Sequence, residues 1–203
     1  MKSVRYVSAI LLLTLYTQLV VAMSPPEKII IETSETMLSK IHKEGDALRE
    51  NKQKVYQMIE EVIVPHIDFE RMSKWVLGKY WRTATDDQKT RFEKEFRSLL
   101  MRTYATAISE YSGEKFEYLP SRYQEGDKDT NVRTELRQPG NPNPIAVNYS
   151  LHLINGRWLV YDIVIEGVSL ISNYRTSFAS QIKRSSLDAL IEQLVERNKQ
   201  RTG

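Results

Sequence analysis

The 203-residue chain contains no cysteine. This absence excludes disulfide bonds, thiol nucleophiles and cysteine-ligated metal sites, so the hydrophobic core alone must hold the fold. Histidine is also scarce, and no two of His42, His66 and His152 have the spacing of a zinc-binding helix. The chain lacks the G-x-S-x-G, Walker and G-x-G-x-x-G patterns that position nucleophiles or phosphates. We therefore expect neither a metal nor a cofactor.

Long hydrophobic runs are missing except at the N-terminus. There, residues 7–21 (VSAILLLTLYTQLVV) follow the cations Lys2 and Arg5, and Ala22 supplies a small residue at a cleavage position. This order predicts a Sec-type signal peptide over residues 1–22 and a single mature domain over residues 23–203. The alternative is an N-terminal membrane anchor, which the shortness of the uninterrupted apolar core disfavours. An exported chain without cysteine suits the bacterial periplasm.

A large excess of charge of one sign is missing as well. The formal net charge is +3, and loss of Lys2 and Arg5 with the signal peptide would lower it to +1. Nucleic-acid binding needs a strong basic footprint, so we expect no nucleic-acid partner. No later stretch is apolar enough to span a bilayer, so we expect the mature protein to be soluble.

Apolar residues with helical spacing dominate the first half of the mature chain. They run through residues 27–64, where Gly45 allows a break, and continue in a long helix that starts at Thr85. Thr85 and Gln88 form a capping box, in which each side chain bonds the backbone N–H of the other residue. Two further helices are predicted at the C-terminal end, over residues 170–183 and 187–199.

Between these helical regions the apolar period changes from 3.6 to two, which indicates strands. Asn155-Gly156 predicts a type I′ turn between the last two strands of this region. The fold class is therefore α+β, with helices packed on a curved, mostly antiparallel sheet of about four to five strands. The strand segments read directly from the pattern are residues 115–123, 129–138, 144–154 and 157–166.

The expected hairpin register tests whether strand carboxylates can form a catalytic pair. A regular two-residue turn places Tyr149 opposite Asp162. Asp162 and Glu166 then lie on one face with Cα atoms roughly 13 Å apart, beyond the about 5 to 10 Å of glycosidase carboxyl pairs. The same register puts Asp162 and His152 on opposite faces. We expect Asp162 to be a hydrogen-bonded strand residue rather than a catalytic one.

The strand over residues 158–165 is apolar on both faces apart from Asp162. Helix packing covers one face, and the other face must be covered too or enclose a ligand. Aromatic residues are concentrated in this strand and in the helices that precede and follow it. Three interpretations fit this pattern: an ordinary core rich in tyrosine, a lined cavity, or an oligomer face.

Two segments carry a resemblance to a known family. Residues 65–113 contain the pieces PHIDF, LGKYW and AT..Q..RF..EF..LL.RTY, and residues 158–178 contain W.VYD..IEGVSL..NYR..F. In this order and behind a predicted signal peptide, they resemble the MlaC-type periplasmic phospholipid-binding proteins, also described as the toluene-tolerance auxiliary component of an ABC transport system. The resemblance spans nearly all of the mature chain and is weakest over residues 122–144.

The resemblance implies an NTF2- or cystatin-like sheet around a deep hydrophobic cavity, with no catalytic residues. It implies a carrier of glycerophospholipids that maintains outer-membrane lipid asymmetry. The implied partners are phospholipid, an inner-membrane ABC complex with an MCE-domain subunit, and an outer-membrane lipoprotein–porin complex, and we expect a monomer. Thirteen residues are the candidates to line the cavity: Trp75, Tyr80, Phe96, Leu100, Tyr104, Val147, Tyr149, Val160, Ile163, Val164, Val168, Leu170 and Tyr174.

Two other classes of function stay open on the residues alone. One is a small isomerase-type enzyme on an NTF2-like cone, with Asp162 and a tyrosine as acid and base. The other is a periplasmic adaptor whose apolar face binds a protein. The lack of a convergent polar constellation disfavours the enzyme, which would also require a pocket of small-substrate size.

Overall fold

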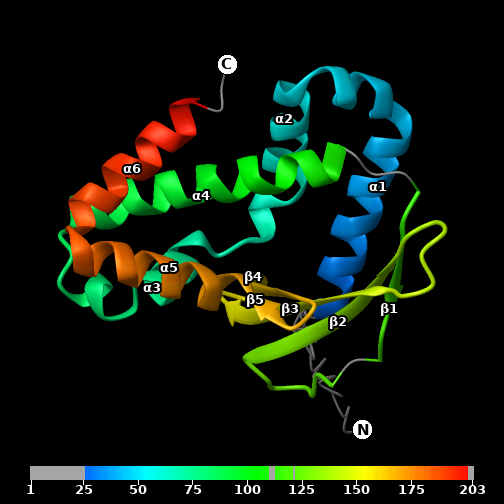
Figure 1. The fold of residues 1–203 in the computed structure, drawn as a ribbon. Coiled ribbons are helices and arrows are strands. Elements are labelled where there is room, and N and C mark those ends of the chain that lie inside the picture. The colour runs from blue at the N-terminus through cyan, green and yellow to red at the C-terminus, as the bar shows by residue number, and fades with distance from the viewer. Residues whose placement is uncertain (1–25, 110–112, 121, 201–203) are drawn as a thin grey trace, which may run out of the picture.

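The computed structural model of the protein describes residues 26–109, 113–120 and 122–200 (Figure 1). The predicted signal peptide, residues 1–22, lies outside these ranges. Within them, no helix is both long enough and apolar enough to cross a bilayer.

The described chain begins with two helices, α1 (Pro26–Glu50) and α2 (Lys52–Val62). The break expected at Gly45 is wrong, because α1 continues through that residue. A single interior glycine costs a helix only about 1 kcal/mol, which packing of its neighbours can offset. The chain instead breaks at Asn51, whose side chain accepts a hydrogen bond from the backbone N–H of Gln53 and so caps α2.

Short helical pieces follow and lead into the longest described helix after α1. They are η1 (Val64–His66), α3 (Phe69–Leu77) and η2 (Gly78–Arg82), and the long helix is α4 (Asp86–Ser109). The predicted capping box of α4 is confirmed. Gln88 Oε1 accepts from Thr85 N at 3.0 Å, and Thr85 Oγ1 accepts from Gln88 N at 3.2 Å.

Five strands then form one antiparallel sheet in the order of the chain. They are β1 (Lys115–Tyr118), β2 (Asp129–Arg137), β3 (Ile145–Ile154), β4 (Arg157–Ile165) and β5 (Val168–Ser169). The predicted α+β class with four to five antiparallel strands is confirmed. The type I′ turn is confirmed as well, since Asn155 and Gly156 have φ of 49° and 76°.

A β-bulge in β4 changes the expected hairpin register. Pairing is regular from the turn as far as Leu151 opposite Val160, but Ser150 then pairs with Asp162. One extra residue, Tyr161, is accommodated on β4, so the predicted pairing of Tyr149 with Asp162 is wrong. Every later side chain of β4 therefore points to the face opposite to the one that a regular ladder predicts.

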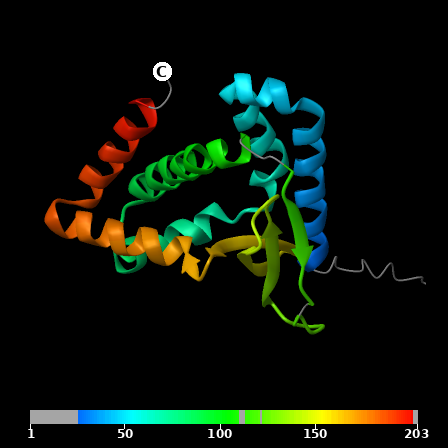
Figure 2. The same cartoon turned by 45° about the vertical axis from the view of Figure 1, so that its right-hand side comes forward.

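The helices pack on one side of the sheet in two groups (Figures 1 and 2). In both views α4 runs across the molecule, with α1 and α2 at one side and α5 (Leu170–Arg184) and α6 (Leu187–Gln200) at the other. The second group encloses a cluster that we call the aromatic core, in which rings from α4 and α5 pack together. The aromatic core consists of Phe92, Phe96, Tyr174 and Phe178.

Candidate functional site

A cavity of about 280 Å³ lies between the inner face of the sheet and helices α1 to α4. It exceeds the volume of about 150 Å³ at which an engineered apolar cavity stays dry and binds benzene. The walls come from β3 and β4, from the apolar sides of α1, α2 and α4, and from the segment that joins α2 to α3. The cavity can therefore hold an apolar group larger than a single ring.

The joining segment is tied to the sheet, which fixes that wall. Ile67 makes an isolated parallel bridge to Val160, and Asp68 N donates a hydrogen bond to Val160 O at 2.9 Å. Asp68 also caps α3, because its Oδ1 accepts from Arg71 N at 2.8 Å. These bonds turn the first residue of α3, Phe69, toward the cavity that Ile67 also lines.

The bulge decides which β4 side chains reach the cavity. Before the bulge Val160 faces it, and after the bulge Ile163 and Ile165 do, opposite Tyr149 and Val147 of β3. A regular ladder would instead turn residues 162 and 164 inward. The bulge thus removes a carboxylate from the cavity wall and replaces it with isoleucine.

The cavity is electrically neutral at neutral pH. Among the described residues that line it, none is an aspartate, glutamate, lysine or arginine. Burial and the nearby Arg157 lower the pKa of His66, so its imidazole is uncharged. Burial raises the pKa of Tyr104 and of Tyr149 to about 12, so both phenols keep their protons. An apolar ligand would meet no charge that it must desolvate.

The structure brings seven of the thirteen candidate residues together at this cavity. They come from α4, β3, β4 and the start of α5, which matches the idea of a cavity between facing strands and helices. Whether these side chains contact a ligand stays a prediction. The seven residues are Leu100, Tyr104, Val147, Tyr149, Val160, Ile163 and Leu170.

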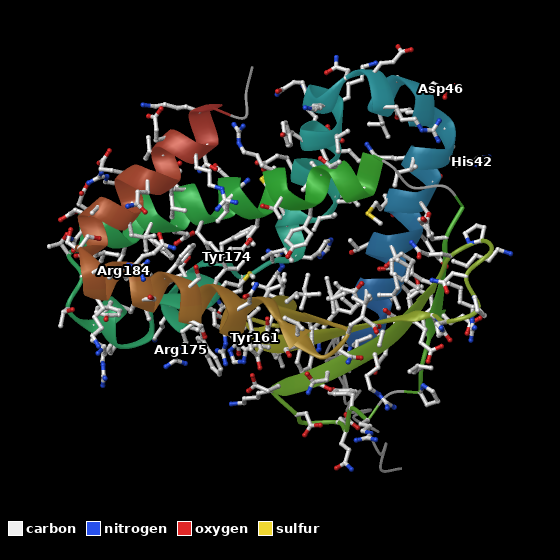
Figure 3. The ribbon with its side chains drawn as sticks, in the orientation of Figure 1. His42, Asp46, Tyr161, Tyr174, Arg175 and Arg184 are labelled. Atoms are coloured by element: carbon white, nitrogen blue, oxygen red, sulfur yellow. The ribbon has the colours of Figure 1, made fainter. Side chains whose placement is uncertain are left out.

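The other six candidates lie outside the cavity lining. Phe96 and Tyr174 belong to the aromatic core, where their rings meet edge to face with centroids 5.2 Å apart. Figure 3 shows Tyr174 on the side of α5 that faces α4. Tyr80 packs against the same cluster of buried residues. An aromatic residue on a helix has the same spacing whether it packs against another helix or lines a cavity.

The remaining three lie on the outer face of the sheet, at its edge, or on the exposed side of α3. Val164 pairs with Asn148, and its side chain points away from the cavity because of the bulge. Trp75 is 44% exposed on α3, and Val168 is 57% exposed on the short edge strand β5. Val168 pairs with Ile165, which lines the cavity, so it lies on the same face of the sheet but beyond the lining.

Sequence reasoning missed the cavity residues of the first two helices and of the joining segment. Ile30 and Met37 of α1, and Ile59 and Ile63 at the end of α2, line the cavity. Their helical spacing was visible as apolar stripes. Spacing alone does not tell a stripe that faces a cavity from one that packs against another helix.

Asp162 has a structural role. Its Oδ2 accepts a hydrogen bond from Ser169 Oγ at 2.6 Å, and its Oδ1 accepts from Ile171 N at 3.1 Å. Ser169 Oγ in turn accepts from Ser172 N, which makes it the N-cap of α5. Because Asp162 pairs with Ser150, it lies on the outer face of the sheet, the side that also carries His152, so the expected separation of Asp162 and His152 on opposite faces is wrong. The carboxylate fixes the start of α5.

His152 bonds elsewhere. Its Nδ1 lies 3.2 Å from Asp129 Oδ1 on the neighbouring strand. Within the described ranges, no group of three or more histidine, aspartate or glutamate residues is arranged to hold a metal ion. His152 therefore bonds a side chain of the same sheet and not Asp162.

Comparison with known proteins gives consistent results. The family model described as MlaC protein matches residues 31–196. The toluene tolerance protein ttg2D of Pseudomonas putida is 25% identical over 181 residues, covering 88% of this chain and 83% of that protein. The intermembrane phospholipid transport system binding protein MlaC of Haemophilus influenzae is 24% identical over 183 residues, covering 89% and 85%.

A solved structure has the same fold. The phospholipid-binding protein of Ralstonia solanacearum, determined in complex with a phospholipid, is 34% identical and superposes with a TM-score of 0.82. The match covers 89% of this chain and 100% of that one. The family match spans most of the chain. The chain belongs to the MlaC family of phospholipid-binding proteins.

Proposed function

We propose that the protein is a periplasmic carrier that holds the acyl chains of a glycerophospholipid in the cavity between sheet and helices. In this role it moves lipid between an outer-membrane lipoprotein–porin complex and an inner-membrane ABC complex with an MCE-domain subunit, and so maintains outer-membrane lipid asymmetry. The single observation that carries the proposal is the uncharged cavity of about 280 Å³ in a chain of this family. The phospholipid bound to the Ralstonia solanacearum relative supports it.

The energetics of such cargo fit a carrier that works by handover. A diacyl lipid has on the order of 30 methylenes, and burying each is worth about 0.8 kcal/mol, which sums to roughly 24 kcal/mol. This gross value lies above the ceiling of non-covalent affinity, so lipid would not escape into water at a useful rate. A bilayer offers the tails equal burial. Loading and unloading would therefore need a docked partner that provides an apolar path.

The neighbouring residues Ile163 and Val164 offer a matched test of the cavity. Ile163→Trp adds a large ring on the cavity side of β4, whereas Val164→Trp adds the same ring on the outer face. Each protein is purified from cells that export it and is analysed by native mass spectrometry. We expect wild type and Val164→Trp to carry phospholipid, and Ile163→Trp to lose most of it while its far-UV circular dichroism is unchanged.

Two outcomes would contradict the proposal. One is wild-type protein that is free of lipid after purification and takes none up from vesicles. The other is equal lipid loading of both tryptophan variants, which would place the cargo outside the cavity. Transport itself is tested by measuring whether fluorescent phospholipid moves from loaded protein to the purified partner complexes and not to buffer.

A further inference from the structure

The outer side of α3 carries a cluster of aromatic and cationic side chains that takes no part in the cavity. Arg71, Lys74, Trp75 and Gly78 follow one another at positions i, i+3, i+4 and i+7, so they form a single stripe along the helix and its C-cap. Trp75 is 44% exposed, an unusual position for so large an apolar ring.

Neighbouring elements complete this cluster. Tyr161, the extra residue of the β4 bulge, places its ring centroid 5.5 Å from that of Trp75. Arg175 of α5 lies against Gly78, since its Nε and Nη2 are 3.1 Å from the position that a Cβ at residue 78 would occupy. Figure 3 shows Tyr161 and Arg175 on the same side of α5, opposite to Tyr174. We call Arg71, Lys74, Trp75, Tyr161 and Arg175 the outer patch.

The rings of the outer patch are held in place by a cation. The guanidinium carbon of Arg71 lies 4.7 Å from the ring centroid of Tyr161 and 5.7 Å from that of Trp75. Its Nη2 also lies 3.3 Å from Asp129 Oδ1. Asp129 is thus shared between Arg71 and His152, and it leaves the other two cations of the patch without a carboxylate.

The outer patch carries a local positive charge on a nearly neutral protein. In the described part of the chain, neither Lys74 nor Arg175 forms an ion pair, and both side chains are exposed. Tryptophan and tyrosine are the residues that settle at the headgroup level of membranes, and each nearby lysine or arginine adds about 1 kcal/mol of attraction to an anionic leaflet. Unpaired cations beside a half-exposed tryptophan fit a surface that presents many phosphate groups.

We propose that the outer patch docks the protein on an anionic lipid bilayer. The docking goes beyond carriage of lipid in the cavity and does not require it. The patch lies on the outside of the same elements that form the cavity wall: Phe69 and Met72 of α3 and Val160 and Ile163 of β4 face inward. Docking through α3 and β4 would therefore bring the cavity-forming elements themselves to the membrane surface.

Vesicle co-sedimentation tests the proposal with a named probe. The full mature protein is mixed with vesicles of equimolar phosphatidylglycerol and phosphatidylcholine, or of phosphatidylcholine alone, at low and high salt. We expect binding to the anionic vesicles only, and weaker binding at high salt because exposed charges are then screened. Substituting both Lys74→Gln and Arg175→Gln should weaken binding roughly thirty-fold at low salt.

A charge-matched control uses two exposed lysines, Lys43 in the C-terminal half of α1 and Lys52 at the start of α2. Lys43→Gln with Lys52→Gln removes the same charge far from α3 and should leave binding unchanged (Figure 1). Trp75→Phe should abolish most of the tryptophan emission shift that the vesicles cause. Lipid content from native mass spectrometry is recorded for every variant, so that a failure of cavity loading is seen separately.

Three results would overturn the docking proposal. They are no sedimentation of the wild type with anionic vesicles, equal binding of the patch and control variants, and an emission shift that persists in Trp75→Phe. The first of these, with lipid still bound in the cavity, would refute docking on a bilayer while leaving the carrier function intact.

Discussion

The cavity and the aromatic core are built from similar apolar residues on some of the same elements. Only the aromatic core is filled by the protein's own side chains. In the aromatic core, Phe92, Phe96 and Phe178 pack with centroids 5.6 to 6.0 Å apart in stacked and edge-to-face pairs. At the cavity, α4 contributes Leu100 and Tyr104, one and two turns further along, and a volume of about 280 Å³ remains. Helix α4 therefore passes from a packed region into an unpacked one.

Apolar side chains alone therefore do not show whether they fill the interior or line a cavity. In the aromatic core, the rings of α4 and α5 are large enough to meet, and Phe96 packs edge to face with both Tyr174 and Phe178. At the cavity, residues of α4 lie across from β3 and β4, with residues of α1 and of the joining segment between them, and the side chains do not fill the space. Close packing is the rule in protein interiors, so a space that is kept open points to a ligand.

The largest expected effect is a difference in stability loss between truncating a side chain of the aromatic core and truncating one that lines the cavity. Phe96→Ala removes a fully buried ring from the aromatic core and should lower the free energy of unfolding by about 3 to 5 kcal/mol. Leu100→Ala, one turn away, only enlarges an existing cavity and should cost about 2 kcal/mol. Urea denaturation of lipid-free protein measures both. Equal losses would mean that the cavity wall is as tightly packed as the core.

A second prediction concerns Asp162, which anchors the helix shared by the two regions. Asp162→Ala removes two hydrogen bonds to the start of α5 and should lower the free energy of unfolding by about 2 kcal/mol. Because Leu170 lines the cavity and Phe178 sits in the aromatic core, we expect the loss to be local. Hydrogen exchange should speed up at Leu170 and Ile171 and stay slow near Phe178.

Ser169→Ala should have a smaller effect, because it removes only the capping hydroxyl. It should lower the free energy of unfolding by about 1 kcal/mol. If Asp162→Ala instead accelerates hydrogen exchange evenly along α5, then the whole helix opens as one unit. The end of α5 at the cavity and its part in the aromatic core would then not open independently.

The smallest expected effect is a pH dependence of the free energy of unfolding that arises from His66 at the cavity. The pKa of His66 is lowered by burial, so the folded chain resists taking up a proton that the unfolded chain accepts. The contribution of neutral His66 to the free energy of unfolding is fully present above the ordinary histidine pKa of about 6.5. It is lost as the pH falls below that value toward the lowered pKa. His66→Phe should remove this loss in urea titrations between about pH 8 and about pH 5.

His42 provides the control because it is exposed on α1 and does not line the cavity. His42→Gln should leave the pH profile as in the wild type. A profile of His66→Phe that still falls in the same range would assign the pH dependence to other groups.

Local signals in the sequence predicted several elements and their ends, but the first strand, expected over residues 115–123, ends at Tyr118. The capping box at Thr85 and Gln88 and the turn at Asn155-Gly156 each depend on a few adjacent residues, and both are present. The switch from helical to alternating spacing predicted the α+β class for the same reason. Gly45 shows the limit of such signals, because helix packing overrides the weak preference of one residue.

The candidate site was predictable only in part. The two segments that resemble the MlaC type indicated a cavity, and seven of the thirteen candidates line one. The position of the bulge was not visible, because inserting Tyr161 into β4 depends on the contacts of that residue with α3 and not on the local alternation. That single insertion explains why Val164 faces outward and why Asp162 leaves the cavity wall.

The amino-acid sequence alone predicted the order of the helices and strands, the capping box at Thr85, the turn at Asn155-Gly156 and the family resemblance, since these follow from neighbouring residues and from recurring motifs. Only the tertiary structure shows which apolar stripes pack on one another and which line the cavity. It also decided that Asp162 binds the end of α5. Those outcomes depend on distances between elements far apart in the chain, and no local pattern encodes such distances.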